Sequence, residues 1–422
     1  MIKLLFKNRN FSVLFWGRTI ANVGDSLYAI AAMWLVYELG GSTFYTGLAG
    51  FLTMTPRILQ FLIGPIVDRI SLKKILVVTQ SIQFVFVISI PLLYYIGVLN
   101  VILLLIIMPI LTLINQFIFP AQSAALPRIV ETDDLVSANS LFSFANSGVN
   151  ILANSTGGVL ITIFGAINIY FLDAFLFLIT IFIFLLLNYS GPSEVKDKSE
   201  GGTFTGHTKR YINDLLDGYK FVRGSIISKF FYGSIAANFS FGIALAVLPA
   251  YSSSRGGVEL YGIFMGTYSA GFLCGVILSP YLKRFNFGKM VITSFFISSL
   301  LWLSSVFVPS NVVSIIIFGM ALIPLGAAEV TMAAVGQRII PQQYLARTFS
   351  LIASISASAM PLGSLFGGYI GTVTNSNLAF AIGSLGMLFV SLAWLIIPQL
   401  RRIPKINEID SRKYFARPND TA

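Results

Sequence analysis

The stretch FSVLFWGRTIANVGDSLYAIAAMWLVY, from Phe11 to Tyr37, contains only two charged residues, Arg18 and Asp25. A helix that crosses a membrane needs about 20 mainly apolar residues, so this stretch is long enough to be one. The whole chain agrees, because 56% of its 422 residues are apolar and only 11% are charged. Soluble domains carry about a quarter charged residues, so we expect a lipid bilayer to surround this chain.

Apolar segments of this kind recur along the chain, and the predicted fold is an all-α membrane protein with twelve spanning helices in two six-helix bundles. The spans are expected at residues 11–37, 44–66, 75–97, 100–120, 137–163, 167–188, 226–251, 259–281, 289–308, 312–335, 347–372 and 376–398. The N-terminal bundle then covers 1–190, a cytoplasmic linker 191–225, the C-terminal bundle 226–400 and a basic cytoplasmic tail 401–422. Within the linker, YINDLLDGYKFVRG favours an amphipathic helix at the membrane surface.

The orientation follows from the basic residues, which gather on the cytoplasmic side of membrane proteins. With both termini inside, all of the 28 Lys and Arg residues except Arg18, Arg57 and Arg255 fall on that side. The net charge of +11 is therefore a topological signal, and no nucleic acid partner is expected. We expect a multi-pass protein of the plasma membrane in contact with lipid.

The composition also excludes several classes of function. The single cysteine, Cys274, cannot form an intramolecular disulfide framework, and the single histidine, His207, lies in the polar linker. No phosphate-binding G-x-x-x-x-G-K-[ST] sequence occurs, and the linkers contain no set of metal ligands. We therefore expect neither an enzyme nor a protein with a bound metal or cofactor.

The two halves of the chain resemble each other. When they are aligned, Leu135 falls on Leu345 and Ser140 on Ser350; Gly157 and Gly158 fall on Gly367 and Gly368. Together these matches indicate a duplicated six-helix bundle. Two such bundles with a site between them describe the major facilitator architecture.

The loop GPIVDRISLKK, after the second predicted span, resembles the signature loop of the major facilitator superfamily. The resemblance is carried by Gly64, Asp68, Arg69, Lys73 and Lys74, whereas Ser71 replaces the usual second glycine. It implies that Asp68 and Arg69 hold the two bundles together on the inner side when the transporter faces outward. The alternative is a basic loop that only obeys the positive-inside rule.

Three longer stretches resemble the twelve-helix drug:proton antiporters that include macrolide efflux proteins and the enterobactin exporter. They are RTIANVGDSLYAIAAMWLVYELGGSTFYTGL, FPAQSAALPRIVETDDLVSANSL and RIIPQQYLARTFS. This resemblance implies proton-driven export of a bulky, partly lipophilic molecule. One departure concerns the G-P-x-x-G-G sequence of such antiporters, because Ala153 and Asn154 stand here in place of its glycine and proline.

Charged residues inside the spans cost at least about 2.5–3.5 kcal/mol each, so they need a reason. Arg18 and Asp25 are two helical turns apart, too far for a direct ion pair. We expect Arg57 to pair with Asp25 across the first two spans. Asp25 is the favoured proton carrier, tuned by Arg57 and Arg18; the alternative is a permanent structural pair.

Two other acids lie in later spans. Glu329, in the tenth span, is expected to bind a cationic substrate or carry a second proton; alternatively it reaches the cytoplasmic surface. Asp173, near the outer end of the sixth span, is expected at the membrane interface. The polar residues expected to line the cavity are Asn22, Tyr28, Asn115, Gln116 and Asn238.

The sequence thus predicts a secondary active exporter of amphiphilic small molecules, coupled to the proton gradient without a cofactor. Its expected partners are the substrate, protons and lipid, and a monomer is assumed. A dedicated carrier of one metabolite, siderophore or lipid is a second interpretation. A non-transporting membrane partner or immunity protein is a third.

The gating role of the signature loop is testable. We expect Asp68→Asn to keep normal membrane expression but to abolish transport, because the loop loses the charge that holds the closed inner side. Expression is measured by immunoblot and transport by accumulation of substrate in cells. Full transport by this variant would refute the role.

Overall fold

The computed structural model describes residues 3–56, 63, 67, 70–188, 226–340 and 342–409. In these ranges all regular structure is helical, and nine helices are long and apolar enough to cross a membrane. A tenth span is α8 (Leu135–Phe164), which bends by 48° near residue 155. The predicted all-helical membrane fold is confirmed, whereas the count of twelve spans stays a prediction.

The chain divides into two compact units. The first contains Met1–Gly41, Leu52–Thr208 and Val258–Gly266; the second contains Ser42–Phe51, Lys209–Gly257 and Thr267–Ala422. In this division two short segments, 42–51 and 258–266, are each grouped with the unit that is formed mainly by the other half of the chain. The predicted domain bounds stay a prediction. The predicted linker helix lies outside the described residues.

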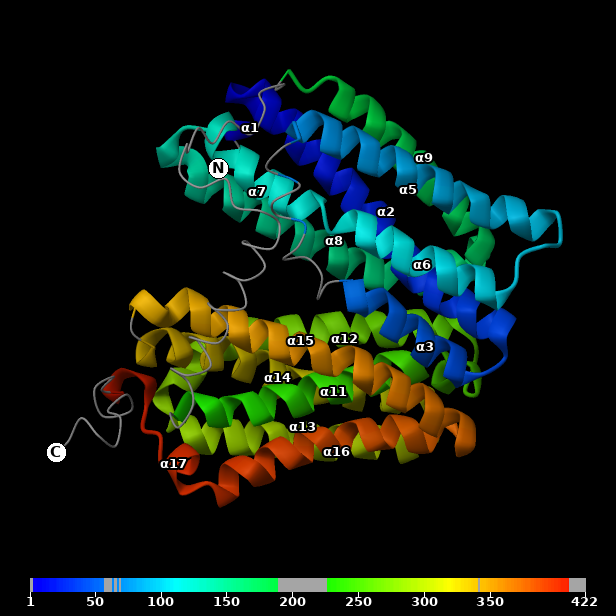
Figure 1. The fold of residues 1–422 in the computed structure, drawn as a ribbon. Coiled ribbons are helices and arrows are strands. Elements are labelled where there is room, and N and C mark those ends of the chain that lie inside the picture. The colour runs from blue at the N-terminus through cyan, green and yellow to red at the C-terminus, as the bar shows by residue number, and fades with distance from the viewer. Residues whose placement is uncertain are drawn as a thin grey trace. The chain divides into compact units, whose positions relative to one another are not determined.

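Most helices of the first unit come from the N-terminal half of the chain. They are α1 (Lys3–Lys7), α2 (Arg9–Gly40), α5 (Leu72–Tyr95), α6 (Val101–Asn115), α7 (Ile118–Ile129), α8 and α9 (Ala166–Leu185). Helix α9 packs along both α2 and α5, and α8 packs on α2 (Figure 1). Helix α2 is therefore covered from several sides by the rest of its unit.

Asparagines begin several of these helices. The side chain of Asn8 accepts a hydrogen bond of 3.0 Å from the Phe11 amide at the start of α2. Asn100 caps α6 in the same way, and Asn375 caps α16 (Ser376–Ile396) of the second unit. Such a cap satisfies an amide that the helix itself leaves without a partner, which matters most where water is scarce.

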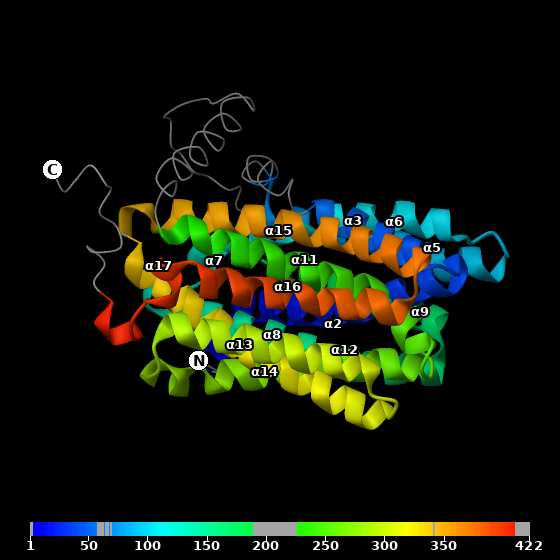
Figure 2. The same ribbon diagram turned by 90° about the horizontal axis from the view of Figure 1, so that it is seen from below.

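The second unit is built around α11 (Ile226–Ser253), which packs against α15 (Gln342–Val373) and α16 (Ser376–Ile396) (Figure 2). Helix α13 (Phe287–Phe307) packs against both α16 and α14 (Asn311–Ile339). The rings of Trp302, Phe318 and Phe380 meet at 5.5–5.6 Å between these three helices. The remaining elements are α12 (Val258–Leu278), η3 (Ser279–Arg284), α17 (Pro398–Arg401) and η4 (Ile406–Glu408).

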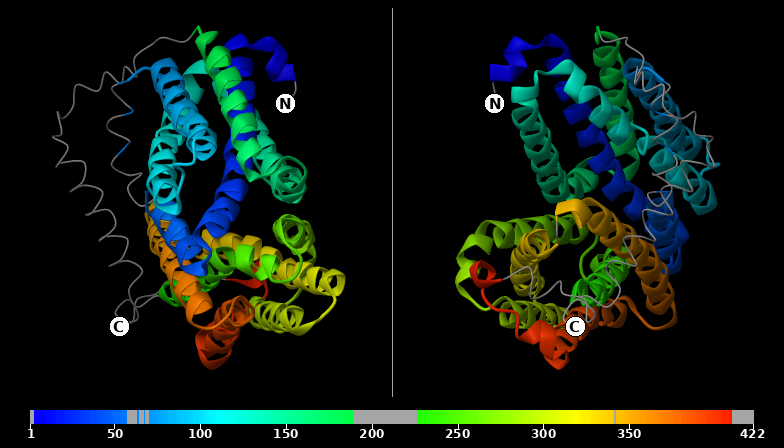
Figure 3. Two further views of the ribbon diagram at one scale, coloured as in Figure 1. Left: turned by 90° about the vertical axis from the view of Figure 1, so that its right-hand side faces the viewer. Right: turned by 60° about the vertical axis from the view of Figure 1, so that its left-hand side comes forward.

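The first residues of the predicted C-terminal tail belong to the body of the second unit. Ile403, Ile406 and Ile409 are buried. The Phe287 amide, at the start of α13, donates to the Pro404 carbonyl at 3.1 Å, and Arg338 at the end of α14 donates to the carbonyls of Asn407 and Ile409. Figure 3 shows this C-terminal segment in red.

Glycines allow two helix pairs to touch backbone to backbone. Gly47, in α3 (Thr43–Met54), lies so close to Gly368 of α15 that a side-chain carbon built on Gly368 would come within 2.7 Å of the Gly47 Cα. Gly158 of α8 and Gly262 of α12 meet in the same manner. Since Gly158 and Gly368 correspond in the internal repeat, both copies of the repeat use the same glycine for a close helix contact.

These contacts predict a stability defect. We expect Gly368→Leu to lower the free energy of unfolding by about 1–3 kcal/mol, because the larger side chain meets the α3 backbone. The matched control is Gly148→Leu, since nothing lies within 4 Å of a side-chain carbon at Gly148. Thermal unfolding of the purified protein in detergent measures both; equal midpoints would contradict the packing argument.

Candidate functional site

The Asp25 carboxylate lies where three helices of the first unit meet. Asn115 of α6 donates a hydrogen bond of 2.9 Å to one oxygen, and Gln83 of α5 donates one of 3.4 Å to the other. Gln83 in turn accepts a bond of 2.9 Å from Gln80, and both glutamines are buried. Each Asp25 oxygen therefore has an amide donor, which favours the ionised form of a carboxyl group.

Arg18 lies near Asp25 without forming an ion pair with it. Its guanidinium donates to the Asn22 side chain at 3.0 Å, one turn along α2. The other two guanidinium nitrogens, Nε and Nη1, are buried and have no hydrogen-bond partner among the described residues. Arg57 lies outside the described residues, so the pairing of Arg57 with Asp25 stays a prediction.

Asp173 is fully buried within α9, with 0% of its surface exposed. A side-chain carbon at Gly24 of α2 would overlap the Asp173 carboxyl group, so the glycine makes room for the acid. The packing thus turns this face of α9 onto α2. The depth of Asp173 in the membrane, which the sequence places at the interface, stays a prediction.

Two tyrosines surround this buried acid. Tyr28 of α2 and Tyr170 of α9 form an edge-to-face ring pair with centroids 5.8 Å apart. Both lie close enough to Asp173 for a charge on its carboxyl group to act on their hydroxyl groups. Neither tyrosine hydroxyl nor either Asp173 oxygen has a hydrogen-bond partner in the described part of the chain. We call the group Arg18, Asn22, Asp25, Tyr28, Gln80, Gln83, Asn115, Tyr170 and Asp173 the buried polar cluster.

Not all predicted cavity residues belong to the buried polar cluster. Gln116 and Asn238 donate to carbonyls of their own helices, those of Thr112 and Ser234. Glu329 is exposed on α14 in the second unit, where Tyr268 of α12 lies within its electrostatic range. The roles predicted for these three residues stay predictions.

Only the end of the predicted gate loop falls in the described part of the chain. Lys73 donates a hydrogen bond of 2.7 Å to the carbonyl of Leu185, the last residue of α9. A cation at a helix C-terminus is favoured by the helix dipole, so Lys73 fastens α5 to α9. Lys74 is exposed. Gly64, Asp68 and Arg69 lie outside the described residues.

Sequence reasoning missed three members of the buried polar cluster, Gln80, Gln83 and Tyr170, and it missed the contact between Gly24 and Asp173. Two glutamines three residues apart in the otherwise apolar span 75–97 were a usable signal, since amides in such a span need partners. No comparable signal marks Gly24, because its function depends on a residue far away in the sequence.

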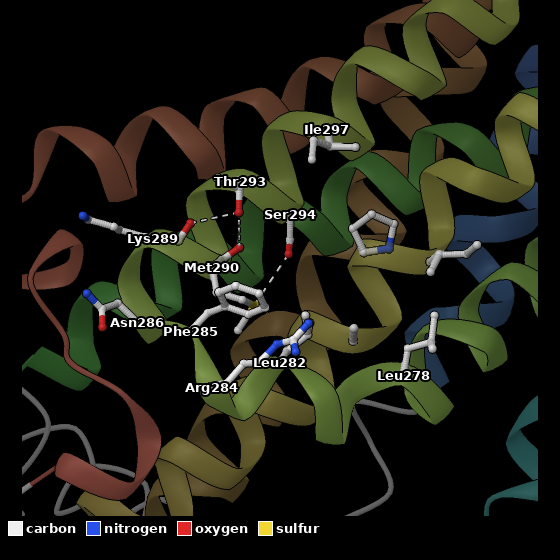
Figure 4. Close-up of a pocket in the computed structure, with 13 residues that line it drawn as sticks. Leu278, Leu282, Arg284, Phe285, Asn286, Lys289, Met290, Thr293, Ser294 and Ile297 are labelled. Carbon is white, nitrogen blue, oxygen red and sulfur yellow. Dashed lines mark hydrogen bonds between the residues drawn. The ribbon is translucent and has the colours of Figure 1, made fainter.

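The second unit contains an apolar pocket of about 680 Å³ between α12, η3, α13 and α14. Figure 4 shows Lys289 and Asn286 on one side of the pocket and Leu278 on the opposite side. None of the predicted site residues lines this pocket. The candidate site is therefore the buried polar cluster of the first unit.

The fit between Gly24 and Asp173 predicts a coupled effect of two substitutions. We expect Gly24→Ala to lower the free energy of unfolding by about 1–3 kcal/mol, because the added carbon overlaps the carboxyl group. The same change should cost less in an Asp173→Ala background, which removes the group that it meets. Gly148→Ala is the matched control, and thermal unfolding in detergent gives all values; additive effects would show that the two residues do not touch.

Comparisons with known proteins agree with this architecture. The transmembrane secretion effector family matches residues 5–421. An uncharacterized MFS-type transporter, YvqJ of Bacillus subtilis (strain 168), is 23% identical over 417 residues, which cover 96% of each chain. A second one from the same organism, YfiS, is 22% identical and covers 94% of this chain and 95% of its own.

Solved structures give the same result for the fold. The nucleoside transporter NupG has a TM-score of 0.73 at 12% identity, covering 95% of this chain and all of its own. A bacterial homologue of the iron transporter ferroportin, in an inward-facing state, has a TM-score of 0.67 at 14% identity, covering 93% of this chain and 99% of its own. These likenesses concern the fold alone. With a family match over nearly its whole length, the chain belongs to the transmembrane secretion effector family of major facilitator superfamily transporters, and it is a multi-pass membrane transporter rather than an enzyme.

Proposed function

We propose that this transporter exports amphiphilic small molecules, drug-like or macrolide-like, in exchange for protons by alternating access. The observation that carries the proposal is the pair of carboxyl groups between α2 and its neighbours in the first unit, the half-buried Asp25 and the fully buried Asp173. Buried acids inside a membrane helix bundle are costly, and proton relays are a common reason for keeping them.

The export direction has separate support. The family that matches this chain is described as a transmembrane secretion effector family, and three stretches of the sequence resemble drug:proton antiporters. Export of this kind needs only the proton gradient. The positive-inside distribution of Lys and Arg supports a plasma-membrane protein with both termini in the cytoplasm.

The buried polar cluster suits a proton-coupled cycle. Asp25 receives two amide hydrogen bonds, and Arg18 places a positive charge one to two turns away on the same helix. A change in the contact of α2 with α6 and α9 would alter the surroundings of both acids, Asp25 and Asp173. The affinity of the site for a proton would then depend on conformation, which is what coupling requires.

The test is accumulation of lipophilic dyes, macrolides and other antibiotics in efflux-deficient cells, with and without a protonophore. We expect the wild type to lower accumulation of several compounds, and both Asp25→Asn and the protonophore to abolish this effect. Loss follows for the variant because Arg18 would keep a buried positive charge without its nearest acid. The matched control is Glu38→Gln, an acid-to-amide change at an exposed position of the same helix.

Each other outcome has a distinct meaning. Export by Asp25→Asn at the wild-type rate would remove Asp25 from the coupling mechanism and direct attention to Glu329. Export that ignores the protonophore would refute proton coupling. If no compound in the panel is exported, a dedicated carrier of one metabolite or a non-transporting partner becomes the better interpretation.

A further inference from the structure

We propose that the two acids of the buried polar cluster have different tasks: Asp173 binds and releases the transported proton, while Asp25 remains an ionised, fixed charge. This inference rests on the proposed function and names the residue that performs the proton step. It also reverses the preference that the sequence alone gives to Asp25. The argument begins with the hydrogen-bond donors that each carboxyl group receives.

The surroundings of Asp25 stabilise a negative charge. One oxygen accepts from Asn115 at 2.9 Å and the other from Gln83 at 3.4 Å. Arg18 adds a positive charge that acts on Asp25 through electrostatics. An ionised carboxylate accepts hydrogen bonds at both oxygens. In a protonated acid one oxygen carries the proton and accepts poorly, so one of the two amide donors would lose its partner. These interactions favour the ionised form of Asp25, and of the two acids only Asp25 has them among the described residues.

Among the described residues, none supplies Asp173 with such a donor or counter-charge. The residue is fully buried, and neither oxygen receives a hydrogen bond from the described residues. A charged carboxylate in this position would lose its hydration without compensation, whereas a neutral acid loses much less when it is buried. Asp173 in this conformation therefore carries its proton.

The other charged and titratable groups near α9 support this division. Within the buried polar cluster, these groups are Arg18, Asp25 and Tyr28 on α2 and Tyr170 on α9 itself. Asp25 is the nearest acid, and two neighbouring carboxyl groups share one negative charge more easily than they hold two.

The remaining described neighbours of α9 add no counter-charge to Asp173. From α5, Lys73 binds the Leu185 carbonyl at the far end of α9, and Tyr95 interacts with Asn168 and Phe171 nearer its start. Tyr94 is exposed, as is Lys74. Helix α8, which also packs on α9, has no titratable residue in its sequence.

The Gly24 contact explains how such a proton would be released. Asp173 is kept from water by α2, which approaches closely because residue 24 has no side chain. When α2 shifts along α9, the carboxyl group becomes accessible and its O–H bond ionises to water. Rebinding a proton from the other side of the membrane restores the neutral acid and allows the helices to close again.

The first test uses the proton itself as the probe. Infrared spectroscopy of the purified full-length protein at neutral pH detects the C=O band of a protonated carboxyl group, which ionised Asp and Glu lack. We expect the wild type, Asp25→Asn and Glu329→Gln to show this band and Asp173→Asn to lose it. Retention of the band in Asp173→Asn, or its loss in Asp25→Asn or Glu329→Gln, would overturn the assignment. A band that is present in potassium buffer and disappears in sodium buffer would also overturn the assignment, because Na⁺ would then be what the Asp173 carboxyl group binds.

The second test separates the proton step from the fold. Ethidium is used as the transported probe in proteoliposomes, with an imposed pH gradient or with ethidium exchange at equal pH. Asp173→Asn mimics the protonated acid, so we expect it to lose gradient-driven transport but to keep exchange. Asp25→Asn should lose both, because Arg18 loses its nearest acid in either mode.

Two further variants guard against misfolding. Thr180→Val is the matched control, since Thr180 is equally buried on α9 and bonds only within its own helix. Asp173→Glu keeps a carboxyl group, so its infrared band should shift rather than vanish.

The two ways of failing look different. If the wild type moves ethidium without regard to the pH gradient, or not at all, the proposed coupling to this class of substrate fails, even where the infrared band still assigns a proton to Asp173. If the wild type is gradient-driven and Asp173→Asn is driven equally well, the proposed function stands and this inference is overturned.

Discussion

Inside a bilayer a polar side chain has only the protein to bind to, and this constraint governs the packing of the first unit. Helix α2 carries Arg18, Asn22, Asp25 and Tyr28 through the membrane, and none of these groups can be satisfied by hydrocarbon. The neighbouring helices supply amide donors: Asn115 from α6 and Gln83 from α5 both donate to the Asp25 carboxylate. The arrangement of α2, α5 and α6 is thus set by a few hydrogen bonds as well as by apolar packing.

The sequence predicts well whatever one segment decides alone. The span expected at 11–37 is observed as Arg9–Gly40, and its ends are explained by Asn8 and Gly41, the latter in the left-handed conformation. The spacing of Arg18 and Asp25 correctly excludes a direct ion pair. Of the predicted polar residues, Asn22 bonds to Arg18 and Asn115 to Asp25, because amides in an apolar helix need polar partners. That these residues line a cavity stays a prediction.

Contacts between distant segments could not be predicted in this way. The rotation of α9 about its own axis decides whether Asp173 faces α2 or the lipid, and nothing within residues 167–188 fixes that rotation. Gly24 appears in the sequence as one glycine among 36, and its meaning becomes clear only beside Asp173. Likewise Lys73 belongs to a signature loop by sequence, yet it binds the end of α9. A single sequence contains no record of such pairings.

The polar face of α2 also has a consequence for biosynthesis. Of the nine helices in the described part of the chain that meet the requirements for spanning, α2 is the least apolar, and it is made first. Its partners Gln83, Asn115 and Asp173 are synthesised later, on strongly apolar helices that enter the membrane easily. Until they arrive, Arg18 and Asp25 face lipid or the insertion machinery without their final neighbours. The polar groups of α2 therefore have all their partners only after α9 has been inserted. The first unit thus reaches its final packing as a whole rather than helix by helix.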